Sequence, residues 1–255
     1  MNRLYERLQQ EAIRIANLYP VPDFYRDFAG AVRASRRFFD GDAIVAELWQ
    51  FVSETIENDF GHGLTHVYHV ALDAGTLAQI ESASVCGRDE QIEHRVRMAQ
   101  AAGLLHDIKR KEKNHARAGA EYARRLLCYF PFSGSDTEAI CLAIGNHEAF
   151  GVNQKGRTRA SELLSDCLYD ADKFRWGPEN FTQTLWAMVS YHDVPLDRFL
   201  SHYPRGMAYL KKIRNTFRTP TGRRYGPQFI DLGIAIGEEL HELIYREFAD
   251  HIAPS

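Results

Sequence analysis

Four side chains of this sequence have the types and the order of a metal-ligand set. His106 and Asp107 are adjacent and close the apolar run 101–105, His66 lies upstream, and Asp172 lies downstream. Two imidazoles and two carboxylates give a mixed nitrogen and oxygen donor set, which suits a borderline or hard divalent ion. Adjacent helical residues reach one ion only when it lies on the helix flank, so neighbouring helices must supply His66 and Asp172. The sequence therefore predicts a metal-dependent active site inside a helical bundle.

Helical periodicity dominates the rest of the chain. In the window 42–58 the apolar residues recur at spacings of three and four, as Ile44, Leu48, Phe51, Val52 and Ile56. Such a stripe is typical of an amphipathic helix, and the windows 64–80, 91–107, 115–130 and 136–148 have the same pattern. Ser135 followed by Glu138 predicts a capping box at the start of the last of these helices. We therefore expect an all-α fold.

The segments between these windows are short, and none has the length or polarity of a domain linker. We expect one all-α domain over residues 1–255, with a functional core at about 60–175. Residues 1–58 are rich in aromatic side chains and predict an added helical layer. The alternative role for the aromatic N-terminal residues is a homo-oligomer contact, and residues 178–250 predict further helices that close the bundle.

Composition excludes several classes of protein. The 255 residues are 45% hydrophobic and 25% charged, with a formal net charge of −3. No basic field is available to attract nucleic acid, which argues against nonspecific DNA or RNA binding. The 4 cysteines form no C-x-x-C pair, as expected of reduced thiols in a cytosolic protein. The N-terminal residues have no apolar signal core and no run of 18 apolar residues occurs, so we expect a cytoplasmic protein without a membrane anchor.

The local surroundings of the four ligands resemble those of the HD superfamily of metal-dependent phosphohydrolases. The matching segments are H-V-Y-H-V at 66–70, A-G-L-L-H-D-I at 102–108 and D-A-D-K-F at 170–174. Two looser matches are N-H-A-R-A-G-A at 114–120 and T-P-T-G-R-R at 219–224. The resemblance implies a helical HD bundle that hydrolyses a phosphate ester or anhydride of a nucleotide or related small metabolite. It also implies that His66, His106, Asp107 and Asp172 bind one divalent ion, which may be Mn, Mg, Fe, Co, Ni or Zn.

Two further histidines lie where dinuclear members of this superfamily have extra ligands. His115 follows the His-Asp pair by nine residues, and His147 lies in Gly145-Asn146-His147-Glu148. The pair could bind a second ion with Asp107 bridging, or it could contact the substrate phosphate or act as a general acid with no second ion. The sequence slightly favours phosphate contact or general acid catalysis over the second ion. Asp107 would orient the attacking water or accept its proton.

Cations follow the ligands directly, at Lys109, Arg110, Lys111 and Lys113. Such charges suit a helix C-terminus through its dipole, and they can also neutralise phosphoryl oxygens. We expect Lys109 and Arg110 to bind substrate phosphate, and His62, one turn before His66, to support substrate binding.

The resemblance leaves two other function classes open. A di-iron oxygenase of the HD type would use the same histidines, and a non-catalytic nucleotide-binding HD module would retain the fold alone. The G-Y-P signature of the cyclic-di-GMP phosphodiesterases is absent. Arg110 occupies the position where HD deoxynucleoside monophosphatases have Glu, which argues against that specific activity.

Overall fold

The computed structural model describes residues 3–56, 63–83 and 89–251, and within these ranges it contains helices and no strands. The first nine helices are α1 (Arg3–Ala16), α2 (Asp23–Asp27), α3 (Ala29–Gly41), α4 (Ala43–Thr55), α5 (Leu64–Ala83), α6 (Asp89–Leu105), α7 (His115–Leu127), α8 (Gly134–Gly145) and α9 (Arg159–Phe174). The π-helix η1 (Asn180–Thr184), α10 (Leu185–Tyr191), α11 (Leu196–Ile213), α12 (Pro220–Glu247) and the 3-10 turn η2 (Ala249–His251) follow. The all-α prediction is confirmed.

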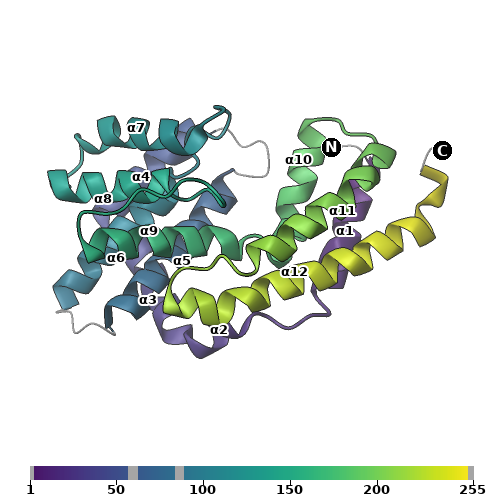
Figure 1. Cartoon of the computed structure of the whole chain (residues 1–255), viewed down its shortest axis with the longest axis horizontal. Coiled ribbons are helices and arrows are strands. Elements are labelled where there is room, and N and C mark those ends of the chain that lie inside the picture. Colours follow the sequence, from purple (N-terminus) through teal and green to yellow (C-terminus); the bar gives the residue numbers. More distant parts are fainter. Residues whose placement is uncertain (1–2, 57–62, 84–88, 252–255) are drawn as a thin grey trace.

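The helices gather in two groups that share one long element. Helices α3 to α9 lie together at one side, α1, α10 and α11 lie at the other, and α12 runs along both groups (Figure 1). The helices α5, α6, α8 and α9 pack against one another. His66, His115 and Asp172 lie on α5, α7 and α9, and the other predicted ligands follow the ends of α6 and α8.

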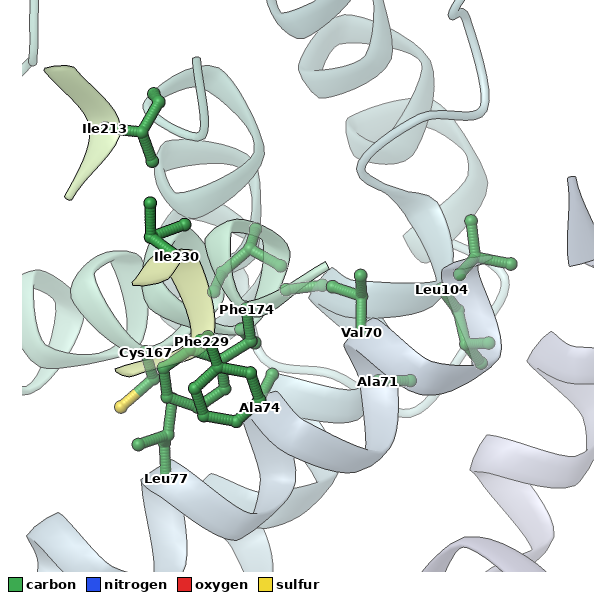
Figure 2. Close-up of a cluster of buried hydrophobic side chains, with 14 of the residues drawn as sticks. Val70, Ala71, Ala74, Leu77, Leu104, Cys167, Phe174, Ile213, Phe229 and Ile230 are labelled. Carbon is green, nitrogen blue, oxygen red and sulfur yellow. The ribbon is translucent and has the colours of Figure 1, made fainter. Parts of the chain in front are cut away.

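The apolar core joins α5 and α9 to the start of α12. Figure 2 shows the α5 side chains Val70, Ala71, Ala74 and Leu77 beside Phe174 and Phe229. The rings of Phe174, at the end of α9, and Phe229, on α12, stack with centroids 4.1 Å apart and planes 2° from parallel. Burial of apolar side chains is the main force that holds such helices together. It fixes the end of α9, which carries Asp172, against α5, which carries His66.

The N-terminal segment does not form one continuous layer. Helix α1 packs against η1, α10 and α12, whereas α3 packs against α5 and α6 and α4 against α6. The short α2 connects them and contributes Phe24, which is fully buried among aromatic rings of α9 and α12. The predicted layer at 1–58 is therefore divided between the two groups of helices.

Side-chain caps define where several helices begin. The Asp42 carboxylate accepts hydrogen bonds from the backbone N–H groups of Ile44 and Val45 at the start of α4. The capping box of α8 is formed by Ser133 and Asp136, so the sequence prediction of Ser135 and Glu138 was wrong by two residues. The pattern S-x-x-D precedes S-x-x-E in this segment, and the earlier serine captures the free N–H groups because the helix begins at Gly134.

Helix α6 ends at Leu105, so His106 and Asp107 lie in the first turn beyond it. The predicted helix 91–107 is thus two residues too long, within the usual uncertainty of helix ends. Leaving the helix frees the two side chains from the angular spacing of adjacent helical residues. None of the helices in the described ranges has the length and apolar character to cross a membrane.

Gly103 allows α6 to approach α5 closely at the level of the ligands. A Cβ atom at this position would lie 2.5 Å from the Cα atom of Ala71 and 2.8 Å from its nitrogen. Backbone atoms cannot move aside as a flexible side chain can. The absence of a side chain at Gly103 therefore sets the separation between His66 on α5 and His106 after α6.

We predict that Gly103→Ala lowers the free energy of unfolding by about 2–3 kcal/mol, because the added methyl group forces the α5 and α6 backbones apart. Gly206→Ala is the matched control, since a Cβ at Gly206 on α11 meets nothing within 4 Å. It should be neutral or stabilise by up to about 1 kcal/mol through its better helix propensity. Urea unfolding of both variants measures the difference, and equal stabilities would contradict the close-approach argument.

Candidate metal centre

The predicted ligands His66, His106, Asp107 and Asp172 converge in the structure. The Nε2 atoms of His66 and His106 lie 3.2 Å apart, and Asp172 Oδ1 lies 3.4 Å from His66 Nε2. Asp107 Oδ2 lies 3.5 Å from His106 Nε2 and 3.8 Å from His66 Nε2. Two atoms bound at about 2.1 Å to one ion are separated by about 3.0–3.4 Å in octahedral or tetrahedral geometry. His66, His106 and Asp107 therefore lie close enough to hold one ion, and Asp172 Oδ1 lies beside them, 3.9 Å from His106 Nε2; we call these four donors the first donor group.

A second donor group uses the other oxygen of the same carboxylate. Asp107 Oδ1 lies 3.5 Å from His147 Nε2 and 3.6 Å from His115 Nε2. The two Nε2 atoms are 3.2 Å apart. His115 begins α7 and His147 follows α8, so three separate segments supply this group. Its three side chains satisfy the spacing of a metal site as closely as those of the first group.

One histidine of each group is oriented by a backbone carbonyl next to its outer nitrogen. His106 Nδ1 lies 2.8 Å from the carbonyl oxygen of Gly103, and His147 Nδ1 lies 2.6 Å from that of Ile144. A carbonyl only accepts hydrogen bonds, so each Nδ1 carries the hydrogen and the neutral ring has its lone pair on Nε2. That lone pair faces the other donors. Backbone carbonyls commonly hold metal-binding histidines in this tautomer.

The contact with Arg110 indicates the same tautomer for His115, with the hydrogen on Nδ1 and the lone pair on Nε2. Arg110 Nη1 lies 2.8 Å from His115 Nε2 and 3.7 Å from Asp107 Oδ1. A guanidinium only donates, so His115 Nε2 is the acceptor, while His115 Nδ1 lies 3.3 Å from Glu148 Oε1. In the second donor group, lone pairs therefore converge with a carboxylate oxygen. Such a cluster requires positive charge, which a cation or Arg110 itself can supply.

The protonation states of the site are those that metal binding requires. Burial lowers the pKa of His106 to about 3, and burial likewise lowers the pKa of His115. Burial acts to raise the pKa of Asp107, but His106, His147 and Arg110 outweigh it and hold that pKa well below the ordinary value. Lys173 and His66 do the same for the pKa of Asp172 against its burial. Ionised carboxylates and neutral imidazoles are the forms that bind divalent ions.

The remaining predicted site residues are not all brought to the donors. Lys109 Nζ lies 4.9 Å above the ring of Tyr122 and 3.5 Å from Glu112, so Lys109 is directed towards α7 and the neighbouring turn. Of the two cations predicted to bind phosphate, the structure brings Arg110 to the centre and not Lys109. Both residues lie in the turns that follow α6, so helical spacing does not decide which side chain faces the donors. His62 lies outside the described residues.

A buried ion cluster connects the helices that carry His66 and Asp172. Arg175, at the end of α9, forms a hydrogen bond and ion pair with Asp73 of α5 and lies 2.6 Å from Glu179 Oε2. The hydroxyl of Tyr25 donates to Asp73 at 2.8 Å, and His69 Nδ1 lies 2.9 Å from Glu179. Buried charges are retained only when paired. The cluster therefore fixes the register of α5 against α9, next to the ligands.

Sequence reasoning missed three residues that shape the centre. Glu148 contacts His115, Lys173 pairs with Asp172, and Arg175 holds α9 to α5. Glu148 and Lys173 each follow a predicted ligand directly in the sequence, which is a usable signal. Arg175 has no such signal, because Asp73, the partner that ties it to α5, lies 102 residues away.

Comparison with known proteins agrees with this arrangement. Residues 63–177 match the family model described as HD domain. Over 98 residues the chain is 37% identical to a bifunctional uridylyltransferase/uridylyl-removing enzyme of Rhodopseudomonas palustris, a match that covers 34% of this chain and 10% of that enzyme. The chain thus spans a small part of that relative.

A solved structure also resembles the chain. It is a predicted HD superfamily hydrolase from an uncultured Thermotogales bacterium, with 24% sequence identity and a TM-score of 0.46 over 81% of this chain and 92% of that one. The family match includes His66, His106, Asp107 and Asp172, each in the order that the motifs predicted. Residues 63–177 of this chain are therefore an HD domain, and the resemblance read from the sequence is confirmed.

Proposed function

We propose that this protein is a metal-dependent phosphohydrolase with two divalent ions, one in each donor group and both bound by Asp107. The observation that carries the proposal is the Asp107 carboxylate, whose Oδ2 lies 3.5 Å from His106 and whose Oδ1 lies 3.5 Å from His147. A carboxylate that presents one oxygen to each of two histidine pairs is suited to bridge two ions. Manganese, magnesium, iron, cobalt, nickel and zinc all accept such donors.

The residues divide the work of phosphate hydrolysis between them. His66, His106 and Asp172 hold one ion, and His115 and His147 hold the other. When bound, such ions lower the pKa of water and polarise a phosphoryl oxygen. Arg110, whose side chain is 35% exposed, faces the outer edge of the second donor group. A guanidinium in this position neutralises charge on the phosphoryl group and orients it for in-line attack.

Metal binding by His115 and His147 competes with the general acid role that the sequence slightly favoured for them. Both Nε2 atoms lie within 3.6 Å of Asp107 Oδ1, and both Nδ1 atoms already face acceptors. A ring whose Nε2 binds an ion cannot deliver a proton from that atom. The geometry therefore supports the two histidines as ligands and leaves Asp107 and Arg110 as the groups nearest the reacting phosphate.

We further propose a small phosphorylated metabolite, and most specifically a nucleotide, as the substrate class. The relative from Rhodopseudomonas palustris is named as an enzyme that removes uridylyl groups, which are nucleotide groups. A di-iron oxygenase is the second candidate, because the two donor groups suit a pair of irons equally well. Arg110 favours the hydrolase, since a guanidinium beside the donors complements a phosphate rather than dioxygen.

The first test is metal content. We expect the purified, metal-loaded protein to contain two divalent ions per chain by plasma mass spectrometry. His147→Ala should reduce this to about one, because it removes a ligand of the second donor group alone. Asp107→Ala should empty both positions, because each group loses the oxygen that the shared carboxylate supplies. His202→Ala, at an exposed histidine on α11, is the matched control and should leave the content unchanged.

Full metal content in both His115→Ala and His147→Ala would contradict the second ion. The two histidines would then be contacts to phosphate, and one ion in the first donor group would serve the enzyme. Full content in Asp107→Ala would contradict the whole assignment.

The second test is catalysis. A screen of phosphorylated metabolites and nucleotides, read by release of phosphate or nucleotide, should find an activity that a chelator abolishes and Mn²⁺ or a similar ion restores. Asp107→Asn should lower kcat/KM by more than about 100-fold, since loss even of an outer-shell partner costs about 10–100-fold. Turnover that persists in excess chelator, once metal removal is verified, would contradict the assignment as a metal-dependent hydrolase. Oxygen consumption without phosphate release would identify the oxygenase.

A further inference from the structure

Three aromatic side chains form a row beside the metal centre, and we call them the aromatic shelf: Trp176, Tyr209 and Phe150. The rings of Trp176 and Tyr209 have centroids 5.4 Å apart, tilted by 42°. Those of Tyr209 and Phe150 are 5.6 Å apart, edge to face at 76°. The residues come from three different places, after α9, on α11 and after α8. Tyr209 lies in the middle of the row.

Trp176, the inner end of the shelf, lies next to a lysine that pairs with the first donor group. Lys173 pairs with the Asp172 carboxylate, and its Nζ lies 5.8 Å from the centre of the Trp176 ring. At the other end of the shelf, Phe150 follows Glu148 by two residues, and Glu148 Oε1 lies 3.3 Å from His115 Nδ1 of the second donor group. A ligand with its phosphate at the donors therefore has the shelf within reach for the rest of the molecule.

Exposure increases along the shelf from Trp176 to Phe150. Trp176 is half-buried, Tyr209 is 36% exposed and Phe150 is 60% exposed. Phe150 is also one of two non-glycine residues in the described ranges with positive φ, at 62°. A bulky side chain rarely adopts this conformation. Such strain persists only where the surrounding structure imposes it, and it is concentrated at functional sites.

Hydrogen bonds join the two ends of the loop that carries Phe150. The side chain of Asn146 donates to the carbonyl of Gln154 and accepts from its backbone N–H, both at 2.9 Å. Arg218 donates to the Asn146 carbonyl at 3.1 Å and to Asn153 Oδ1 at 3.0 Å. These bonds define the loop conformation, so the outward position of Phe150 belongs to the fold. The loop therefore presents an exposed apolar ring at position 150.

We propose that the aromatic shelf binds a planar ring of the substrate by stacking, which makes nucleobase-bearing phosphates the substrate class. The inference rests on the proposed phosphohydrolase function and adds the recognition element for its non-reacting half. Every nucleobase has a π face, so aromatic side chains bind bases by stacking without selecting one. The ions and Arg110 would hold the phosphate at one end, and Tyr209 and Phe150 would hold the base at the other.

The test measures binding without turnover. The probes are phosphonate analogues of AMP and UMP, whose P–C bond is not hydrolysed, and the same analogue of ribose 5-phosphate, which has no base. Calorimetry on the metal-loaded protein should give tighter binding of both base-bearing probes. Tyr209→Leu and Phe150→Leu should each weaken these two probes by about tenfold, and leave the ribose probe unchanged.

Two control variants separate stacking from other effects. Tyr209→Phe retains the ring and should bind all three probes as the wild type does. Tyr129→Leu makes the same change at a tyrosine that is 87% exposed and lies beyond the far end of α7 from His115, and should change nothing. Equal wild-type affinities for the ribose and base-bearing probes would overturn the proposal. So would equal losses for all three probes, or a loss in Tyr209→Phe as large as in Tyr209→Leu.

The binding experiment and the activity screen distinguish failure of the shelf proposal from failure of the hydrolase proposal. If no phosphate is released from any metabolite but binding still depends on Tyr209 and Phe150, the hydrolase proposal falls and the shelf stands as a base-binding site. If phosphate is released from both kinds of substrate and both leucine variants bind all probes as the wild type does, the hydrolase stands and the shelf falls.

Discussion

The Asp107 carboxylate is the point on which the arrangement of this site depends. It is 2% exposed, and its two oxygens face two different histidine pairs. A buried carboxylate is costly unless compensating charges and hydrogen bonds surround it. Here the compensation comes from α5, the end of α6, α7 and the segment after α8, and each of these must approach within one side-chain length. The fold can be understood as the set of contacts that keeps those segments at that distance.

Different contacts hold the individual segments close to Asp107. The missing side chain at Gly103 lets α6 reach α5, and the Arg175 cluster prevents α9 from sliding along α5. Carbonyls of Gly103 and Ile144 turn the imidazoles inward. Beyond the ligands, Asp170 accepts hydrogen bonds from Thr219 and Arg218 and so anchors the start of α12 two residues from Asp172. The ligand positions are therefore determined by backbone approach and buried polar contacts together.

The sequence predicted the helical class, and it predicted that His66, His106, Asp107 and Asp172 would lie together, because a local motif surrounds each of these residues. Helix ends were less accurate, as the α8 cap at Ser133 shows, because two overlapping capping patterns compete there. Which of Lys109 and Arg110 faces the donors depends on the conformation of the turns after α6. Spacing in the sequence does not give that conformation. Arg175 and the aromatic shelf were missed for a related reason. Their partners are distant in sequence, and only packing of α9, α11 and the loop after α8 brings them together.

The most direct test of the account is a crystal structure of the Mn²⁺-loaded protein, measured at the manganese absorption edge. Anomalous scattering locates each ion without reference to the side chains. The account predicts two peaks, one among His66, His106, Asp172 and Asp107 Oδ2, and the other among His115, His147 and Asp107 Oδ1. A single peak in the first donor group at saturating Mn²⁺, with Arg110 still against His115, would contradict the bridging role of Asp107.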